Sequence, residues 1–362
     1  MPYKYLYIDD ESNETVKSYQ DSLSNDELII EYVQIGEINK EYLIKKVEDI
    51  DGILLDLRTD ELPNENTKKV SEFTGAVWGQ HFRDLVTIGE ITKDIPIVLF
   101  STDKKLRETY FRDMTSNNIF DRFLTKDNTP NNAIKKLISL AKGYQKIQQD
   151  KNFNNLLKID IVNLDSRIFS RFIQSSNIPT HEYAQMILKD LIYAKGVLIN
   201  EKYLASRLGI DKDNSEDWDK VKDKFSNAKY NGVFCDGWDR WWMYEVDNIF
   251  EEISETYLSY LDAKERVSIL KEKLGLDNII FSEPITENYS YDYWTVCKAM
   301  KQPLDPMEGF RVYSTSEPKP WQEYEYISLY ALLNPQMLEE KNIKVHLIDK
   351  EKAHNRLEKF NG

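Results

Sequence analysis

Short apolar runs alternate with longer amphipathic stretches between Tyr3 and about Ile147. Apolar runs of about four to eight residues predict buried strands, and the stretches between them have the spacing of helices. This alternation is typical of a parallel sheet that is covered by helices on both faces. The expected strands are Tyr5–Ile8, Leu28–Val33, Gly52–Leu55, Ile95–Phe100 and Phe120–Leu124, and the last helix is expected over Asn132–Gln149. The pattern therefore predicts a flavodoxin-like α/β domain with a five-stranded parallel sheet.

The chain has 362 residues, which predicts two or three domains at roughly 150 residues each. We expect the first domain to span residues 1–148. The polar stretch 149–160 is expected to be a linker or an extension of the last helix. Residues 161–362 are expected to form an effector or docking domain that is mainly α, of the α+β type.

Acidic, hydroxyl and basic side chains follow the predicted strands at the points where these strands end. Asp9 and Asp10 follow the first strand, Asp56 the third, Ser101 the fourth and Lys126 the fifth. In open parallel sheets a ligand binds outside the carboxyl ends of the strands, so these side chains are expected to converge. Clustered carboxylates are costly unless a cation neutralises them, and Mg²⁺ prefers carboxylate oxygen. The sequence thus predicts a magnesium and phosphoryl site.

The segments that carry these residues resemble the receiver domain of two-component response regulators. The matching segments are Tyr5–Glu11, Asp51–Arg58, Pro96–Thr102 and Phe123–Asp127, and the match covers about 40% of the chain. The resemblance implies that an aspartate at the end of the third strand accepts a phosphoryl group in the presence of Mg²⁺. It also implies a histidine kinase or phosphotransfer protein as the partner.

The resemblance also assigns a role to each residue. Asp56 would be the phosphoacceptor, with Lys126 and Ser101 contacting the phosphoryl oxygens. The metal ligands would be Asp9, Asp10, Asp56 and the backbone carbonyl of Arg58. Ser101 and Phe123 would form the switch that reshapes the face around the last strand, and a homodimer through this face is expected.

Three features depart from the receiver pattern. The Met-Pro pair that usually follows the acceptor is absent, and Pro63 comes later. The connection to Ser101 carries an insertion over about Asp60–Gly79, and Asp127 replaces the proline that usually follows the lysine. A pseudo-receiver that keeps the fold as an adaptor without accepting phosphate is therefore an alternative.

The second half contains a winged-helix-like pattern over about residues 196–250. A first helix and turn are expected from Gly196 to Asp211, followed by a helix from Trp218 to about Tyr230. Gly232–Phe234 and Arg240–Val246 are expected to form a hairpin that turns at Asp236 and Gly237. Further helices are expected over Ser166–Ala194 and Arg266–Leu274.

A DNA-binding transcriptional output is one alternative for this half. The second helix would offer Lys220, Lys222, Lys224 and Lys229 to DNA. The same helix contains acidic residues and no arginine, which favours a solvated face with paired charges. Trp238, Trp241 and Trp242 beside Arg240 are either core residues or a contact surface for a protein.

Composition narrows these alternatives. The chain has 62 acidic and 48 basic residues, a net charge of -14, which disfavours nucleic acid. Two cysteines and four histidines supply neither a disulfide framework nor a zinc site, so we expect a cytoplasmic protein that does not use the membrane. No enzyme signature is present. We expect no catalysis beyond self-phosphorylation from phosphodonors and autodephosphorylation.

Overall fold

The structure is a computed structural model that describes residues 1–36, 38–106, 118–175 and 177–361. Its chain divides into two compact units. The first comprises Met1–Lys189 together with Asn231–Trp238, and the second comprises Asp190–Tyr230 and Asp239–Gly362. This division differs from the expected one, because residues 149–189 and a short later segment pack with the N-terminal sheet.

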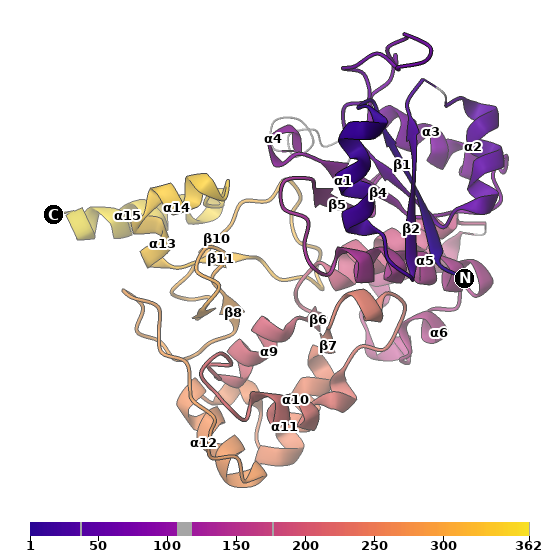
Figure 1. Ribbon diagram of the computed structural model, residues 1–362. Helices are drawn as coiled ribbons and strands as arrows, with labels where there is room; N and C mark the ends of the chain where they lie inside the picture. The colour runs from indigo at the N-terminus through magenta and orange to yellow at the C-terminus, as the bar shows by residue number, and fades with distance from the viewer. Residues whose placement is uncertain (37, 107–117, 176, 362) are drawn as a thin grey trace. The chain divides into compact units, whose positions relative to one another are not determined.

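The first unit contains a five-stranded parallel sheet with the order β2-β1-β3-β4-β5 (Figure 1). This order is that of the flavodoxin-like fold, as the sequence predicts. The strands are β1 (Tyr3–Asp9), β2 (Leu28–Gln34), β3 (Gly52–Leu55), β4 (Ile97–Ser101) and β5 (Arg122–Thr125). The helices around them are α1 (Asn13–Leu23), α2 (Lys40–Lys46), α3 (Gly75–Thr87), α4 (Asp103–Lys105) and α5 (Ala133–Gln149).

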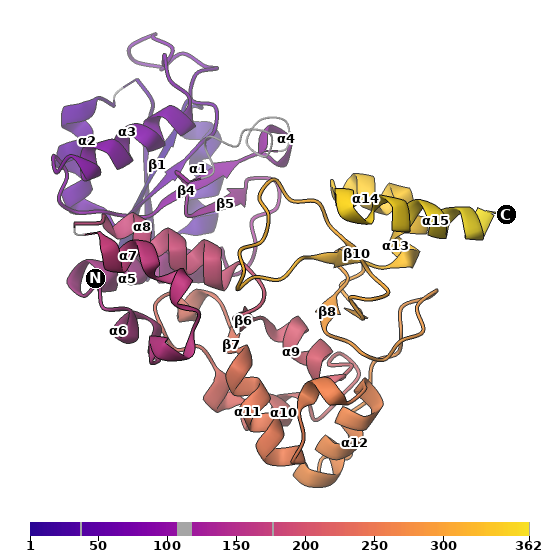
Figure 2. The ribbon, with the colours of Figure 1, turned by 180° about the vertical axis from the view of Figure 1, so that it is seen from behind.

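Helices cover both faces of this sheet, as Figures 1 and 2 show. Successive side chains of a strand point to opposite faces. Leu6 and Ile8 accordingly join the apolar cluster that contains Phe82 of α3. The Tyr5 hydroxyl instead donates to a backbone oxygen of α5, that of Leu137, at 2.7 Å.

The remainder of the first unit extends α5 with short helices. They are α6 (Phe153–Leu157), α7 (Ser170–Gln174) and α8 (Thr180–Gln185), and a π-helical turn follows over Met186–Ile192. The segment expected to be helical over Ser166–Ala194 is divided into short helices, and the helix start expected at Pro179 and Thr180 is confirmed, since α8 begins at Thr180 after Pro179. α8 packs on α5.

The second unit begins with a strand, two helices and a second strand. These are β6 (Leu198–Ile199), α9 (Glu201–Leu208), α10 (Trp218–Lys224) and β7 (Trp241–Trp242), and β6 pairs antiparallel with β7. An isolated bridge joins Lys229 to Trp241, so this part has the strand and helix order of a winged helix. Helices α11 (Met243–Ser254) and α12 (Ala263–Leu274) complete its core.

The expected hairpin is wrong in its details. Met243–Val246 belongs to α11 and not to a strand, and Gly232–Phe234 forms no strand. Asp236 and Gly237 lie in a 3₁₀ turn over Cys235–Gly237, which packs on α5 in the first unit. Trp238, Trp241 and Trp242 are buried, so the interpretation as core residues is confirmed.

The rest of the second unit consists of short strands and helices around a separate apolar cluster. The strands are β8 (Thr295–Val296), β9 (Pro303–Leu304), β10 (Phe310–Arg311) and β11 (Tyr326–Ile327), and the helices are α13 (Leu329–Leu333), α14 (Pro335–Glu340) and α15 (Lys350–Asn361). No helix among the described residues is both long and apolar enough to cross a bilayer.

A buried ion network fastens α3 to the sheet. The Arg83 guanidinium lies 2.9 Å from the carboxylate of Asp94 and 2.9 Å from that of Asp121. The Tyr144 hydroxyl donates to Asp121 at 2.7 Å, and His181 of α8 contacts Asp94 at 2.8 Å. Because all these groups are buried, each depends on its partners for the solvation that water would supply.

We expect Arg83→Met to destabilise the protein by about 3–5 kcal/mol, because it leaves two buried carboxylates without their cation. Urea unfolding measures the loss. The matched control is Arg171→Met, since Arg171 pairs with Glu182 at 2.9 Å but is 66% exposed, and its loss should cost at most about 1 kcal/mol. Equal effects of the two substitutions would contradict the structural role of Arg83.

Candidate phosphoacceptor site

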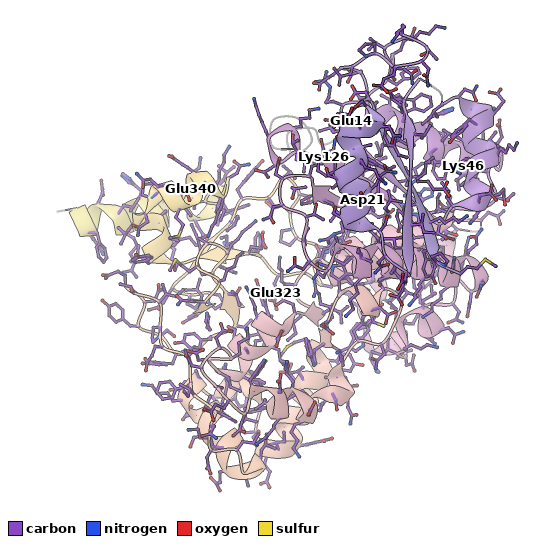
Figure 3. All side chains as sticks on the ribbon, in the orientation of Figure 1. Glu14, Asp21, Lys46, Lys126, Glu323 and Glu340 are labelled. Atoms are coloured by element: carbon purple, nitrogen blue, oxygen red, sulfur yellow. The ribbon has the colours of Figure 1, made fainter. Side chains whose placement is uncertain are left out.

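The expected side chains converge at the carboxyl ends of the strands. Asp9, Asp56 and Ser101 are at most 1% exposed, and Lys126 is 7% exposed (Figure 3 labels Lys126). The Lys126 Nζ lies 2.6 Å from Asp9 Oδ2 and 3.0 Å from Asp56 Oδ1. The lysine therefore neutralises two buried carboxylates that come from β1 and from the end of β3.

Asp10 has a different set of partners. Its Oδ2 accepts hydrogen bonds from the backbone N–H groups of Glu61 and Leu62, at 2.8 and 2.7 Å. These groups belong to the insertion that follows β3. The inserted loop thus folds back over the acid pair and caps one of its carboxylates.

Burial sets the protonation behaviour of the cluster. It raises the pKa of Asp10 from 3.8 to about 6, against the opposing effect of the Leu62 and Glu61 N–H groups. Burial also raises the pKa of Asp56, and the Asp9 charge adds to that rise. For Lys126, burial acts to lower the pKa, but the charges of Asp56 and Asp9 outweigh it and raise the pKa.

Two oxygen atoms at the centre of the site accept or donate no hydrogen bond among the described residues. They are Oδ1 of Asp56, which has only the ionic contact with Lys126, and Oγ of Ser101. Asp56 Oδ2, by contrast, accepts from the N–H of Arg58 at 2.8 Å. Buried polar atoms without partners are rare, and at a cluster of this kind they are typical of a ligand site.

The metal ligands predicted from the resemblance are only partly gathered. Among the described ranges, no three His, Cys, Asp or Glu side chains lie close enough together to hold a metal ion. Lys126 supplies the positive charge beside Asp9 and Asp56. The Mg²⁺ site and the role of the Arg58 carbonyl remain predictions.

The expected switch residues lie on neighbouring strands. Ser101 pairs with Thr125 in the register of β4 and β5, and Phe123 lies two residues earlier on β5. Phe123 is 44% exposed, whereas Ser101 is fully buried. The part of the switch face over residues 107–117 lies outside the described residues.

Three contributors to the site were missed by the sequence reasoning. The Tyr7 hydroxyl donates to Asp9 Oδ2, and Lys105 Nζ lies 4.0 Å from Asp56 Oδ2 and 2.7 Å from Glu61. Tyr7 could have been found, because side chains two apart on a strand share a face. The Glu61 and Lys105 contacts depend on loop conformations that no sequence pattern indicates.

The four lysines proposed for DNA contact are mostly paired with acids. Lys220 lies 2.7 Å from Asp217, Lys222 lies 2.7 Å from Asp219 and 3.0 Å from Glu201, and Lys229 lies 2.8 Å from Asp239. Lys224 lies in the last turn of α10. These pairs favour the interpretation as a solvated face with paired charges.

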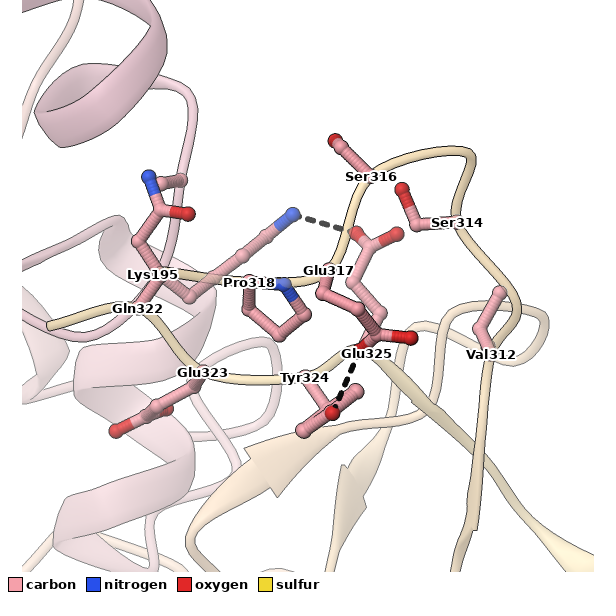
Figure 4. Close-up of a pocket in the computed structure, with 11 residues that line it drawn as sticks. Lys195, Val312, Ser314, Ser316, Glu317, Pro318, Gln322, Glu323, Tyr324 and Glu325 are labelled. Carbon is pink, nitrogen blue, oxygen red and sulfur yellow. Dashed lines mark hydrogen bonds and ion pairs between the residues drawn. The ribbon is translucent and has the colours of Figure 1, made fainter. Parts of the chain in front are cut away.

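A pocket of about 170 Å³ in the second unit is a weaker candidate (Figure 4). Glu325 pairs with Lys195 at 2.5 Å, Glu317 accepts from Tyr324 at 2.7 Å, and Glu323 pairs with Arg207 at 2.5 Å. Each acid of this pocket is therefore already paired with a basic or hydroxyl side chain of the same unit. These pairs indicate a structural network.

Comparisons with known proteins find similar solved structures but no matching family model. No protein-family model matches the sequence, and no curated protein matches it either. Among solved structures, the chain is similar to the N-terminal signal receiver domain of a two-component response regulator from Bacteroides fragilis. That match has 15% identity and a TM-score of 0.26, and it covers 38% of this chain and 97% of the other.

Two further solved structures are similar. A signal receiver domain of a modulated diguanylate cyclase from Desulfovibrio desulfuricans has 16% identity and a TM-score of 0.26, covering 41% of this chain and 99% of the other. The response regulator ChrA of a heme-sensing two-component system has 13% identity and a TM-score of 0.25, covering 76% and 92%.

These similarities are too low to carry an argument about function. The sheet order and the residues at the strand ends stand independently of them. Together they define the N-terminal sheet and its helices as a flavodoxin-like α/β fold with acidic, hydroxyl and basic side chains at the carboxyl ends of its strands. The C-terminal half is unassigned to any family.

The raised pKa of Asp10 leads to a prediction about stability. Between pH about 4 and 6 the folded state holds a proton that the unfolded chain releases, so stability falls as the pH rises through this window. Asp10→Asn removes the charge but keeps an oxygen that accepts from the Glu61 and Leu62 N–H groups. We expect it to be more stable than wild type at neutral pH, by about 1–3 kcal/mol.

Urea unfolding of both proteins across this pH range measures the effect. The difference should shrink as the pH falls from 6 towards 4 and vanish at still lower pH, where Asp10 is protonated in both states. An unchanged stability at neutral pH would show that Asp10 is not held in an environment that disfavours its charge.

Proposed function

We propose that this protein is a phosphoacceptor response regulator in which Asp56 takes a phosphoryl group from a histidine kinase or a phosphotransfer protein. The observation that carries the proposal is the pair of atoms without hydrogen bonds, Asp56 Oδ1 and Ser101 Oγ, beside the Lys126 ammonium. A phosphoryl group on Asp56 would bring oxygen atoms into reach of both neighbours.

Each neighbour has a defined task in this reaction. Asp56 Oδ1 attacks the phosphorus atom of the donor, and the bond from phosphorus to the donor's leaving group breaks. The Lys126 ammonium neutralises charge on the transferred group, and the Ser101 hydroxyl donates a hydrogen bond to another of its oxygens. Asp9, Asp10 and Asp56 would hold Mg²⁺ through their carboxylate oxygens, and the metal would offset negative charge on the phosphoryl group.

The chemistry ends with the loss or transfer of that phosphoryl group. We infer no further catalysis, and the proposal places the protein in the cytoplasm, where its kinase partner would act. The phosphorylated receiver would shift an existing equilibrium between two conformations, and homodimerisation through the receiver face would be one outcome.

We expect Asp56→Asn to abolish labelling by radioactive acetyl phosphate in the presence of Mg²⁺, because an amide oxygen is a poor nucleophile. Removal of Mg²⁺ with a chelator should abolish labelling of the wild type. The matched control is Asp127→Asn, which alters an aspartate beside Lys126 whose carboxylate accepts from the Asp103 N–H at 2.7 Å.

Wild-type protein that stays unlabelled, while a known receiver treated in parallel is labelled, would favour the pseudo-receiver adaptor. Equal labelling of wild type and Asp56→Asn would place the phosphoryl group elsewhere. Loss of labelling in Asp127→Asn as well would mean that the assay reports folding and not the acceptor.

For the output, we propose that the C-terminal half contacts protein and not DNA. The strand and helix order of a winged helix is the one observation that favours DNA. The ion pairs of Lys220, Lys222 and Lys229 oppose it, because a phosphate would have to displace a carboxylate from each lysine.

We expect the full chain, phosphorylated or not, to retard no duplex DNA at low salt. The Lys222→Ala and Lys229→Ala variants should behave like the wild type. A gel shift that weakens steeply with salt, and weakens further in both variants, would establish the DNA-binding alternative.

A further inference from the structure

An open pocket of about 530 Å³ lies between the inserted loop, the start of α2 and α3. It shares no residue with the acid cluster. Pockets of this size hold drug-sized or smaller molecules, and they are usually lined by apolar and aromatic side chains with few polar groups. Here the apolar lining consists of Ile38, Val70, Phe73, Val77 and Trp78.

The aromatic part of the lining is arranged as a platform. The rings of Phe73 and Trp78 meet edge to face with centroids 5.8 Å apart, and the Trp78 and His81 rings lie 6.2 Å apart. The Trp78 Nε1 donates to Ser71 Oγ at 3.4 Å, which orients the indole. Phe73 and Val77 are nevertheless 46% and 45% exposed, so two large apolar side chains of the pocket remain open to solvent.

The charges at the pocket include both signs. Lys40 is already paired with Glu90 at 2.5 Å. Lys69 and Glu72 also line the pocket, and neither has an ion pair with another residue in the described part of the chain. One free cation and one free anion thus border an aromatic pocket.

We propose that this pocket binds a small aromatic zwitterion, such as an aromatic amino acid. Phe73 and Trp78 contact its ring, Lys69 its carboxylate and Glu72 its ammonium group. Aromatic side chains favour offset or edge contacts with a ligand ring, and they exclude water from it.

The pocket and the phosphoacceptor site share a loop. The buried side chain of Asn64 donates to the Ile35 carbonyl at 2.9 Å, and the Glu65 N–H donates to Gln34 Oε1 at 2.9 Å. The Gln34 amide in turn donates to the Asp10 carbonyl at 3.0 Å. The loop that lines the pocket is therefore hydrogen-bonded to the residue that the proposed function assigns to the metal.

Calorimetric titration of the full chain with L-tryptophan tests the site. We expect saturable binding of one molecule per chain. Indole-3-acetate, which lacks the ammonium group, and tryptamine, which lacks the carboxylate, should each bind more weakly by up to about fivefold, since one exposed ion pair is lost.

Val77→Trp fills the pocket from α3 and should weaken binding of tryptophan at least about tenfold, because the ring loses its place on the platform. The matched control is Ile88→Trp, at a 66% exposed position at the end of the same helix that does not line the pocket. It should leave the affinity unchanged. Circular dichroism verifies that both variants fold.

Absence of saturable binding to the wild type would overturn the proposal. Equal affinity in Val77→Trp and wild type would overturn it as well, and tighter binding of indole-3-acetate than of tryptophan would overturn the zwitterion assignment. Because calorimetry does not depend on labelling of Asp56, a failure of the proposed phosphorylation would leave the binding result interpretable on its own.

Discussion

The contact of one lysine with two buried carboxylates is the constraint on which the candidate phosphoacceptor site depends. Asp9 and Asp56 lie at the ends of different strands, and their charges would repel each other because both side chains are buried. Lys126 reaches both, at 2.6 and 3.0 Å, and keeps the strand ends together. The ammonium balances negative charge that would otherwise be costly to bury.

The inserted loop adds a second constraint to the same site. In addition to capping Asp10, the loop is closed by a hydrogen bond from Thr59 Oγ1 to the Phe73 carbonyl at 2.7 Å. After this loop, the backbone at Gly75 comes close to the backbone of Asp56. At Gly75 a side chain would lie 1.8 Å from the Asp56 carbonyl oxygen, so a residue without Cβ is needed at the start of α3. The acceptor strand, the insertion and α3 are thus one continuous unit.

The sheet could be predicted from the sequence because most of its strands are centred on short apolar runs that are followed by polar residues. The strand ends then placed Asp9, Asp56, Ser101 and Lys126 correctly, since the carboxyl ends of parallel strands meet at one edge. The contacts between the inserted loop and Asp10 could not be predicted, because they are made by backbone N–H groups, which every residue except proline carries.

The secondary structure of the C-terminal half was harder to predict from the sequence, for a different physical reason. Met243–Val246 is apolar enough for a strand, but in the structure it begins an amphipathic helix whose buried positions are Met243, Val246 and Phe250. Short apolar runs are ambiguous between the two, and tertiary packing decides. The pairs of Lys220 with Asp217 and of Lys222 with Asp219, by contrast, followed from the alternation of charge along α10.

The segment Asn231–Trp238 belongs to the first unit although it comes from the second half of the sequence. Ser139 of α5 is hydrogen-bonded to Phe234 at 3.0 Å, and the Phe234 ring lies so close to Gly143 that an added Cβ would come within 2.0 Å of it. Trp238 stacks with Arg122 of β5 at 5.6 Å. During synthesis, α5 and Arg122 therefore lack these contacts until the chain has been made through Trp238, almost ninety residues after the end of α5.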